Sequence, residues 1–156
     1  MNGQGSPRLY HTAKRLMDIL GASVGLVALG LLFPPIGLAI WLEDRGPILF
    51  VQERVGKDGQ LFHVYKFRTM RGRAPANGTS LGDEEGRVTV VGRFLRRTAL
   101  DEVPQFINVL KGEMSLVGPR PELPERYTAY SSWQRRRVEI LPGMTGWWQV
   151  RGRRQP

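Results

Sequence analysis

The longest hydrophobic run in this sequence lies near its beginning, where residues 16–42 contain a single charged side chain, Asp18. This run is longer than the roughly 20 apolar residues that cross a bilayer as a helix. A buried core helix is the alternative interpretation, but a chain of 156 residues can hardly enclose so long an apolar helix. The pattern therefore predicts a helix that enters a membrane.

Two consecutive prolines, Pro34 and Pro35, interrupt this apolar run. Because proline lacks a backbone donor and clashes with the preceding turn, we expect a break or a sharp bend there. A kinked span and a re-entrant helix both satisfy the pattern. Basic residues flank the run on both sides, and the cytoplasmic flanks of membrane helices are enriched in Lys and Arg. We therefore favour a Pro-broken re-entrant helix, with residues 1–45 as the N-terminal membrane segment.

The remainder of the chain, residues 46–156, predicts one small cytoplasmic domain of the α+β class. Strand-like runs at 48–55 and 61–68 flank the turn residues Gly56-Lys57-Asp58-Gly59, and this arrangement predicts a short β-hairpin. The polar segment 71–86 is rich in Gly, Pro and Ala, which is typical of a loop.

Several short helices follow in the predicted domain. Helical spacing indicates one in the basic part of 87–100, one over 101–112 and one over 124–137. Asp101 is the candidate N-cap of the second helix, and Gly112 is its expected C-terminal stop.

Charge and composition limit the classes of partner. The chain carries 23 Lys and Arg against 14 Asp and Glu, a formal net charge of +9. Such an excess indicates an anionic partner, which is a nucleic acid, an anionic lipid surface or a phosphorylated substrate. The chain has no cysteine and only two histidines, far apart, which excludes thiolate and histidine-cluster metal sites. Carboxylates and arginines remain as candidates for chemistry.

The adjacent carboxylates Asp101 and Glu102 are the first candidates. As an N-cap and a first-turn Glu they stabilise a helix by about 1 kcal/mol and need no function. Arg93, Arg96 and Arg97 lie just upstream, however, and arginines beside a helix N-terminus bind phosphate readily. The same surroundings keep a carboxylate ionised as a nucleophile, and a divalent ion would offset its repulsion from a diphosphate.

Other arginines stand in contexts that favour phosphate binding. Arg120 lies between Pro119 and Pro121, whose restricted backbones preorganise its guanidinium for a bidentate contact. A surface loop arginine is the alternative interpretation. Three more arginines follow Trp147 and Trp148, a combination that suits base stacking and phosphate binding or a membrane interface; they are Arg151, Arg153 and Arg154.

A succession of motifs along most of the chain resembles the bacterial monotopic phosphoglycosyl transferases, also called bacterial sugar transferases. The matching motifs are Lys14-Arg15 with Asp18, the Pro-interrupted apolar run, Gln52-Glu53-Arg54-Val55-Gly56, Lys66-Phe67-Arg68-Thr69-Met70, Leu100-Asp101-Glu102, and residues 104–112, 114–121 and 142–147.

The resemblance implies an enzyme that moves a sugar 1-phosphate from a UDP-sugar to undecaprenyl phosphate and releases UMP. In this family Asp101 would be the nucleophile that attacks the β-phosphorus and carries the phosphosugar covalently. Glu102, together with Asp101, would hold Mg²⁺. The family's phosphate-binding arginines correspond to Arg96, Arg120 and Arg153.

The resemblance also implies a place in the cell and a set of partners. We expect a bacterial inner (cytoplasmic) membrane protein whose catalytic domain, residues 46–156, lies on the cytoplasmic face and starts glycoconjugate, exopolysaccharide or O-antigen assembly. The expected partners are a UDP-sugar, undecaprenyl phosphate and the lipid bilayer, without nucleic acid. Family members usually continue beyond Gly152-Arg153, so we expect the catalytic domain to lack a C-terminal part.

Two interpretations without catalysis compete with the enzyme. The first is a basic membrane-anchored module that binds anionic lipid or nucleic acid, with steep salt dependence and indifference to Asp101. The second is a structural subunit that uses the apolar run to bind a partner. Neither explains the Asp101-Glu102 pair. The identity of the transferred sugar and the oligomeric state do not follow from the sequence.

Overall fold

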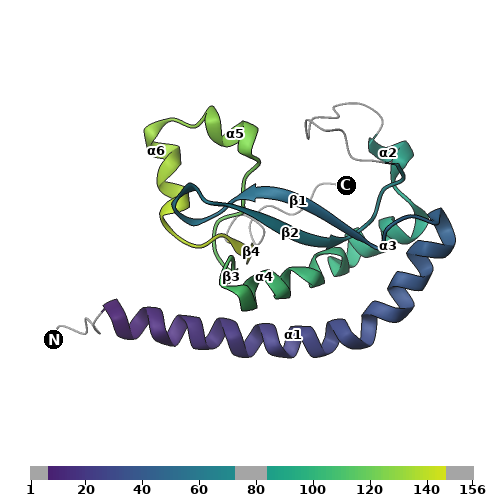
Figure 1. The fold of residues 1–156 in the computed structure, drawn as a ribbon, viewed down its shortest axis with the longest axis horizontal. Coiled ribbons are helices and arrows are strands. Elements are labelled where there is room, and N and C mark those ends of the chain that lie inside the picture. Colours follow the sequence, from purple (N-terminus) through teal and green to yellow (C-terminus); the bar gives the residue numbers. More distant parts are fainter. Residues whose placement is uncertain (1–6, 73–83, 147–156) are drawn as a thin grey trace.

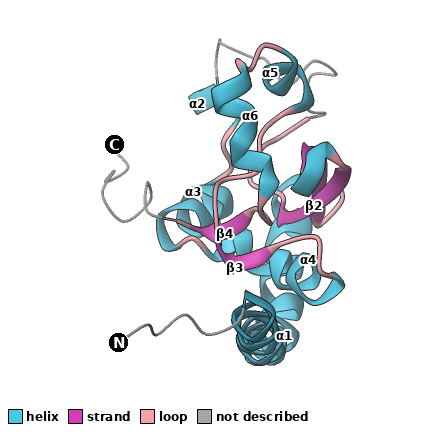
Figure 2. Cartoon of the chain, turned by 90° about the vertical axis from the view of Figure 1, so that its left-hand side faces the viewer, coloured by secondary structure: helices cyan, strands magenta, loops and turns pink. Residues whose placement is uncertain are grey.

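The computed structural model describes residues 7–72 and 84–146, which form one long helix beneath a small domain of short helices and strands. Figure 1 shows the long helix α1 (Pro7–Asp44) along one side, with every other element above it. The view along α1 in Figure 2 places α4 (Phe106–Lys111) directly above this helix. The mixed helix and strand content confirms the predicted α+β class.

Helix α1 passes through Pro34 and Pro35 without ending. Figure 1 shows that its C-terminal part bends toward the domain, so the expected interruption takes the form of a bend. Bends of this kind arise at prolines, which remove backbone donors from the helical ladder but leave the turns on either side intact. The helix is long and apolar enough, over Leu9–Asp44, to cross a membrane by length and composition.

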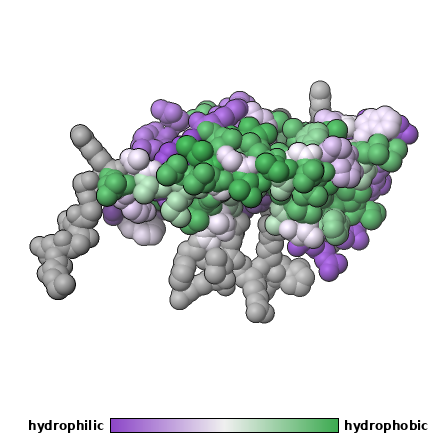
Figure 3. Space-filling model, turned by 90° about the horizontal axis from the view of Figure 1, so that it is seen from below, coloured by the Kyte–Doolittle hydropathy of each residue, from purple (hydrophilic) through white to green (hydrophobic). Residues whose placement is uncertain are grey.

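The two faces of α1 differ in side-chain size and exposure. The outer face is lined by large apolar side chains that are more than half exposed, and Figure 3 shows them as a band along the helix; they are Leu16, Leu20, Val24, Val27, Leu31, Leu38 and Leu42. The inner face carries Asp18, Ala22, Gly25 and Leu29 at helical spacing, all buried. A Cβ at Gly25 would collide with the Phe106 ring, so glycine allows α4 to approach. The protein therefore leaves one apolar face of α1 uncovered.

Polar contacts attach the N-terminal part of α1 to the domain. The Arg15 guanidinium donates to the carbonyls of Val109, at 2.6 Å, and Leu110, at 2.8 Å, which lie in the last turn of α4. The last carbonyls of a helix have no partner within the helix itself, and Arg15 supplements the Gly112 N–H, which also donates to the Val109 carbonyl at 3.1 Å. Asp18 is buried and accepts hydrogen bonds from the Lys14 ammonium, the Ser115 hydroxyl and the Leu116 backbone N–H.

The C-terminal end of α1 is attached to the same domain. The two carboxylate oxygens of Glu43 accept hydrogen bonds from the backbone N–H groups of Val90, at 2.7 Å, and Val91, at 3.0 Å. These groups belong to the first turn of α3 (Val90–Thr98), where N–H groups have no intrahelical partner. Both ends of α1 are therefore anchored to one domain.

The predicted β-hairpin is confirmed. Strands β1 (Leu49–Val55) and β2 (Leu61–Phe67) pair antiparallel, with Gln52 opposite Val64 and Arg54 opposite Phe62. The single turn η1 (Lys57–Gly59) joins them. A second, parallel pair consists of β3 (Ser115–Val117) and β4 (Gly143–Thr145).

Two expectations about the helices require correction. The segment 124–137 is not one helix but three pieces, α5 (Pro124–Thr128), α6 (Ser132–Arg135) and η3 (Arg136–Glu139). The Ser131 side chain caps α6 in a capping box with Gln134, which starts a new helix there. The segment 101–112 likewise divides into η2 (Leu100–Gln105) and α4, although Gly112 ends α4 as predicted, with a φ of 84°.

Two apolar clusters hold the domain to α1. One joins Ala22 to Phe62, Val64, Val109 and Met114, and the other joins Leu29 and Ile40 to Phe67 and Leu95. Side chains of η2 and α4 contribute to both clusters, because Phe106 and Leu110 pack on the first while Val103 and Ile107 pack on the second. The short helix α2 (Glu84–Arg87) precedes α3.

Candidate active site

A left-handed turn at Ala99 positions the two candidate carboxylates. Helix α3 ends at Thr98, Ala99 adopts a φ of 57° and a ψ of 17°, and η2 begins at the next residue. The Ala99 N–H donates to the Arg96 carbonyl, and the Glu102 N–H donates to the Ala99 carbonyl. Ala99, not Asp101, is thus the N-cap, which corrects the expectation. Asp101 and Glu102 lie inside the first turn of η2, which is in contact with α3.

Glu102 forms an ion pair with a lysine of the hairpin. The Lys66 ammonium donates to Glu102 Oε1 at 2.9 Å, and the two side chains are 21% and 12% exposed, respectively. Lys66 lies on β2, which packs against η2. At this degree of burial the pair is screened less by water than a surface pair. Lys66 therefore fixes the Glu102 carboxylate beside Asp101, which is buried.

A small cavity, open to solvent, lies next to this ion pair. Three cations and one carboxylate share its wall; the lining residues are Arg54, Val64, Lys66, Glu102, Gln105, Arg120, Pro121, Gly143 and Met144. The excess of positive charge suits an anionic ligand with several oxygen atoms, such as a phosphate or a diphosphate. Asp101 precedes Glu102 directly in the chain but does not line this cavity.

Backbone hydrogen bonds hold the loop that carries Arg120 from both sides. The Gly143 N–H donates to the Pro119 carbonyl at 2.8 Å, and the Val55 N–H donates to the Glu122 carbonyl at 2.9 Å. The Arg54 guanidinium also donates to the Pro121 carbonyl, at 3.3 Å. The preorganisation of Arg120 that its flanking prolines predict is thus reinforced by β1 and β4.

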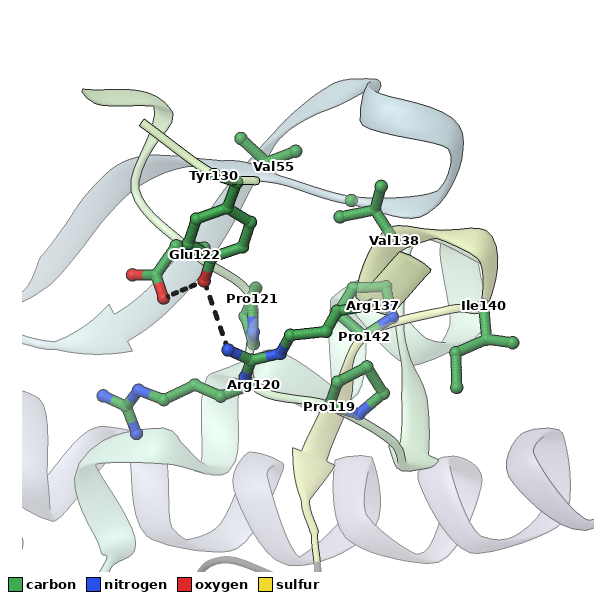
Figure 4. Close-up of a pocket in the computed structure, with 11 residues that line it drawn as sticks. Val55, Pro119, Arg120, Pro121, Glu122, Tyr130, Arg137, Val138, Ile140 and Pro142 are labelled. Carbon is green, nitrogen blue, oxygen red and sulfur yellow. Dashed lines mark hydrogen bonds between the residues drawn. The ribbon is translucent and has the colours of Figure 1, made fainter. Parts of the chain in front are cut away.

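A second hollow lies against this loop and is lined by Pro119, Pro121 and Glu122 among others. In Figure 4, Arg137 reaches across it toward Tyr130, whereas the Arg120 side chain points away from Val138 and Ile140. The Tyr130 hydroxyl donates to Glu122 Oε2 at 2.7 Å and accepts from the Arg137 guanidinium at 3.2 Å. Arg120 and Pro121 of the loop therefore line both hollows.

The Glu122 and Tyr130 pair shifts the pKa of both groups. Burial raises the pKa of the Glu122 carboxyl, but hydrogen bonds from Tyr130 and the Leu123 N–H, with the charges of Arg126 and Arg137, hold it below its usual value. Burial and the Glu122 hydrogen bond raise the pKa of Tyr130. The pair is therefore an ionised carboxylate and a neutral phenol at neutral pH.

Of the other predicted phosphate-binding arginines, Arg96 does not line the cavity beside Glu102. Arg96 lies on the last turn of α3 and donates through Nε to the Thr69 hydroxyl at 2.9 Å. Arg153, with Arg151, Arg154 and the Trp147-Trp148 pair, lies outside the described residues. The structure thus brings together Glu102 and Arg120, two of the predicted site residues, at one cavity.

The sequence profile described as "Bacterial sugar transferase" matches residues 9–156. The chain belongs to the bacterial sugar transferase family. The match covers α1, the hairpin, the Asp101-Glu102 turn and the Arg120 loop, so it includes every element of the candidate site.

Three relatives illustrate the similarity within the family. Galactosyl transferase CpsE of Streptococcus agalactiae is 43% identical over 90% of this chain, and UDP-glucose:undecaprenyl-phosphate glucose-1-phosphate transferase of Escherichia coli is 42% identical over 97%. A putative undecaprenyl-phosphate N-acetylgalactosaminyl 1-phosphate transferase of Bacillus subtilis is 46% identical over 74%. The chain spans 34%, 35% and 65% of these relatives' lengths, respectively.

Sequence reasoning missed two cavity residues of this family member, Lys66 and Arg54. Both lie in motifs that carry the family resemblance, Lys66-Phe67-Arg68-Thr69-Met70 and Gln52-Glu53-Arg54-Val55-Gly56. The strand alternation contained a signal, because Lys66 shares a face of β2 with Phe62 and Val64, both buried. A lysine on the otherwise apolar, buried face of a strand is a signal for a functional site.

The described residues contain no group of three or more His, Cys, Asp or Glu side chains that could hold a metal ion. Asp101 and Glu102 supply two carboxylates, and the Lys66 bond uses the Oε1 atom of Glu102. Mg²⁺ is commonly bound by one or two carboxylates together with substrate phosphates and water. Asp101 and Glu102 are therefore carboxylates of the type that such an ion takes as protein ligands.

Proposed function

We propose that this protein transfers a sugar 1-phosphate from a UDP-sugar to undecaprenyl phosphate and releases UMP. The observation that carries the proposal is the placement of the Asp101-Glu102 turn against a cavity lined by Lys66, Arg54 and Arg120. Relatives named as undecaprenyl-phosphate sugar phosphate transferases support the choice of reaction. The sequence motifs of the family support the assignment of Asp101 as the nucleophile.

The reaction that we propose has two displacements at the same phosphorus. The Asp101 carboxylate attacks the β-phosphorus of the UDP-sugar, and the bond from that phosphorus to the bridging oxygen breaks, so that UMP leaves. The sugar phosphate remains on Asp101 as an acyl phosphate. An oxygen of undecaprenyl phosphate then attacks the same phosphorus, which forms the lipid diphosphate-sugar and restores the Asp101 carboxylate.

The neighbouring side chains bind the diphosphate and its developing charge. Arg120 reaches the cavity from a loop held on both sides, so little motion is required before it binds a phosphate oxygen. Lys66 keeps Glu102 oriented and adds a positive charge. Arg96, and Arg153 outside the described residues, complete the proposed phosphate-binding set. Glu102 and Asp101 would hold Mg²⁺, which neutralises diphosphate charge when bound.

We further propose that α1 is re-entrant, with both ends on the cytoplasmic face of the inner membrane. Arg15 attaches one end of α1 to α4, and Glu43 attaches the other end to α3. A straight span would place these two attachments on opposite sides of the bilayer, which one small domain cannot reach. The bend at the prolines and the uncovered apolar face support insertion into one leaflet. Residues 1–45 form the membrane segment, and residues 46–156 form the catalytic domain.

Release of UMP tests the proposed reaction. The protein, purified in nanodiscs, is incubated with Mg²⁺, undecaprenyl phosphate and a panel of UDP-sugars, beside an Asp101→Asn variant of unchanged circular dichroism. We expect UMP that requires Mg²⁺, the lipid and Asp101, with one sugar preferred. Full activity of Asp101→Asn would refute Asp101 as the nucleophile. If the wild-type protein releases no UMP from any of the UDP-sugars but still binds anionic vesicles, the result would favour a basic membrane-bound module.

A further inference from the structure

Arg54 is held inside the candidate site by two hydrogen bonds that leave its guanidinium at the cavity. One bond runs from Nη1 to the Pro121 carbonyl, at 3.3 Å, and the other runs from Nη2 to Gln52 Oε1, at 2.6 Å. A guanidinium has five N–H donors, so these two bonds orient the group without exhausting its donors. The side chain is half-buried and lines the same cavity as Lys66, Glu102 and Arg120.

The charges around Arg54 favour an anion beside it. Burial and the positive charge of Arg120 lower the pKa of Arg54, and the charge of Glu122 opposes this. A partly buried guanidinium such as Arg54, whose charged form is disfavoured by burial and by a nearby positive charge, is stabilised when an anion lies beside it. The cavity wall carries three cations and one carboxylate, a net charge of +2, which matches a diphosphate better than a singly charged group.

We propose that Arg54 and Arg120 form a two-arginine clamp for the diphosphate of the nucleotide-sugar substrate. This assignment deepens the function proposed above and rests on it. Arg54 comes from β1 and Arg120 from the loop between β3 and α5, and the bond from Arg54 to the Pro121 carbonyl attaches Arg54 to the residue that follows Arg120. A planar guanidinium binds two phosphate oxygens at once, which a lysine ammonium does not.

Binding of UDP, measured by calorimetry on the nanodisc-embedded protein with Mg²⁺, tests the clamp separately from turnover. Hydrogen bonds to charged groups contribute strongly to the binding free energy. Loss of those from Arg54 in Arg54→Gln should therefore weaken UDP binding about tenfold to a hundredfold. Arg54→Lys should recover only part of this loss. Arg136→Gln is the matched control, because Arg136 carries the same charge on an exposed side chain outside both hollows. Unchanged UDP affinity in Arg54→Gln would overturn the proposal.

A double substitution separates direct binding from support of Arg120. If Arg54 contacts the diphosphate, Arg54→Gln weakens UDP binding further in an Arg120→Gln background. No further loss there would mean that Arg54 acts only by holding the Pro121 carbonyl, and the clamp would be refuted. Arg54→Lys, which retains the charge, gives the same test if Arg54→Gln does not fold: affinity equal to wild type would also refute the clamp.

The proposed reaction and the clamp fail in different ways. Wild-type protein that binds UDP with help from Arg54, yet releases no UMP from any UDP-sugar, would refute the reaction and retain the clamp. Wild-type protein that releases UMP while Arg54→Gln binds UDP and turns over normally would retain the reaction and refute the clamp.

Discussion

Lys66 donates a hydrogen bond from its ammonium to Glu102 Oε1 at 2.9 Å, and this ion pair joins strand β2 to the turn η2. The two residues are separated by 36 positions in the chain. The pair holds the carboxylate of Glu102, the residue that follows Asp101. It therefore links the hairpin, which contributes no predicted catalytic group, to the proposed chemistry.

Replacement of Lys66 should affect both activity and stability. Lys66→Met leaves the Glu102 carboxylate without its ammonium partner in a mostly buried place, which should cost about 1–3 kcal/mol of unfolding free energy. We expect UMP release to fall at least about a hundredfold, in line with the loss of one preorganised charge. The measurements are thermal unfolding and initial rates. Lys57→Met is the control, because Lys57 is about half exposed and has only a 4.0 Å contact with Asp58; an equal loss in both variants would contradict a specific role for Lys66.

Replacement of Ala99 by glycine should relieve the backbone strain of its left-handed conformation. An L-residue in this conformation is strained by roughly 1–2 kcal/mol, and glycine has no such penalty. We expect Ala99→Gly to leave the fold unchanged and to raise the midpoint of thermal unfolding. Ala129→Gly provides the contrast, because Ala129 has a φ of −84°, and glycine there only loosens the unfolded chain. A lower midpoint for Ala99→Gly than for Ala129→Gly would contradict the assignment of strain.

The Glu122 carboxylate should stabilise the fold in a pH-dependent way. Its pKa lies below the usual value in the folded protein, so its contribution is present above the unfolded pKa of about 4.3. That contribution is lost as the pH falls through the lower, folded pKa. We expect the unfolding midpoint of wild type to exceed that of Glu122→Gln at pH about 6 and the difference to shrink toward pH about 3. Glu125→Gln, an exposed position on α5, should show no such convergence, and a constant difference for Glu122→Gln would refute the assignment.

The re-entrant arrangement of α1 predicts that both of its flanks are cytoplasmic. The chain contains no cysteine, so single cysteines can be introduced at the exposed positions His11 and Pro47 without competing thiols. A membrane-impermeant maleimide should label neither in intact spheroplasts and both after permeabilisation. Lys57→Cys, at the hairpin turn, marks the domain side. Labelling of His11→Cys alone in intact spheroplasts would indicate a straight span and exclude the re-entrant helix.

Local patterns determined several elements of this protein before any tertiary contact is considered. The hairpin follows from two strand-like runs around a Gly-bounded turn, and the end of α4 follows from Gly112, whose φ of 84° few other residues adopt. The long apolar run likewise determined a helix over 16–42. These features arise from interactions among residues within a few positions of each other.

Other predictions from local patterns were wrong or incomplete for an identifiable reason. Aspartate is a favoured N-cap residue, but η2 begins earlier than Asp101, because Ala99 adopts the left-handed conformation and is the N-cap. The segment 124–137 has helical spacing, but the Ser131 capping box begins a separate helix within it. In both cases a neighbouring residue competes for the helix start, and spacing alone does not rank the two starts.

The sequence by itself determined the family, the apolar helix, the hairpin and the candidate residues Asp101, Glu102 and Arg120. Only the tertiary structure placed Lys66 on Glu102, Arg54 beside Arg120, and both ends of α1 on one domain. The physical reason is distance along the chain, since Arg15 and Leu110 are 95 positions apart. Local propensity cannot encode such a hydrogen bond, which forms only when packing of the whole chain brings its donor and acceptor together.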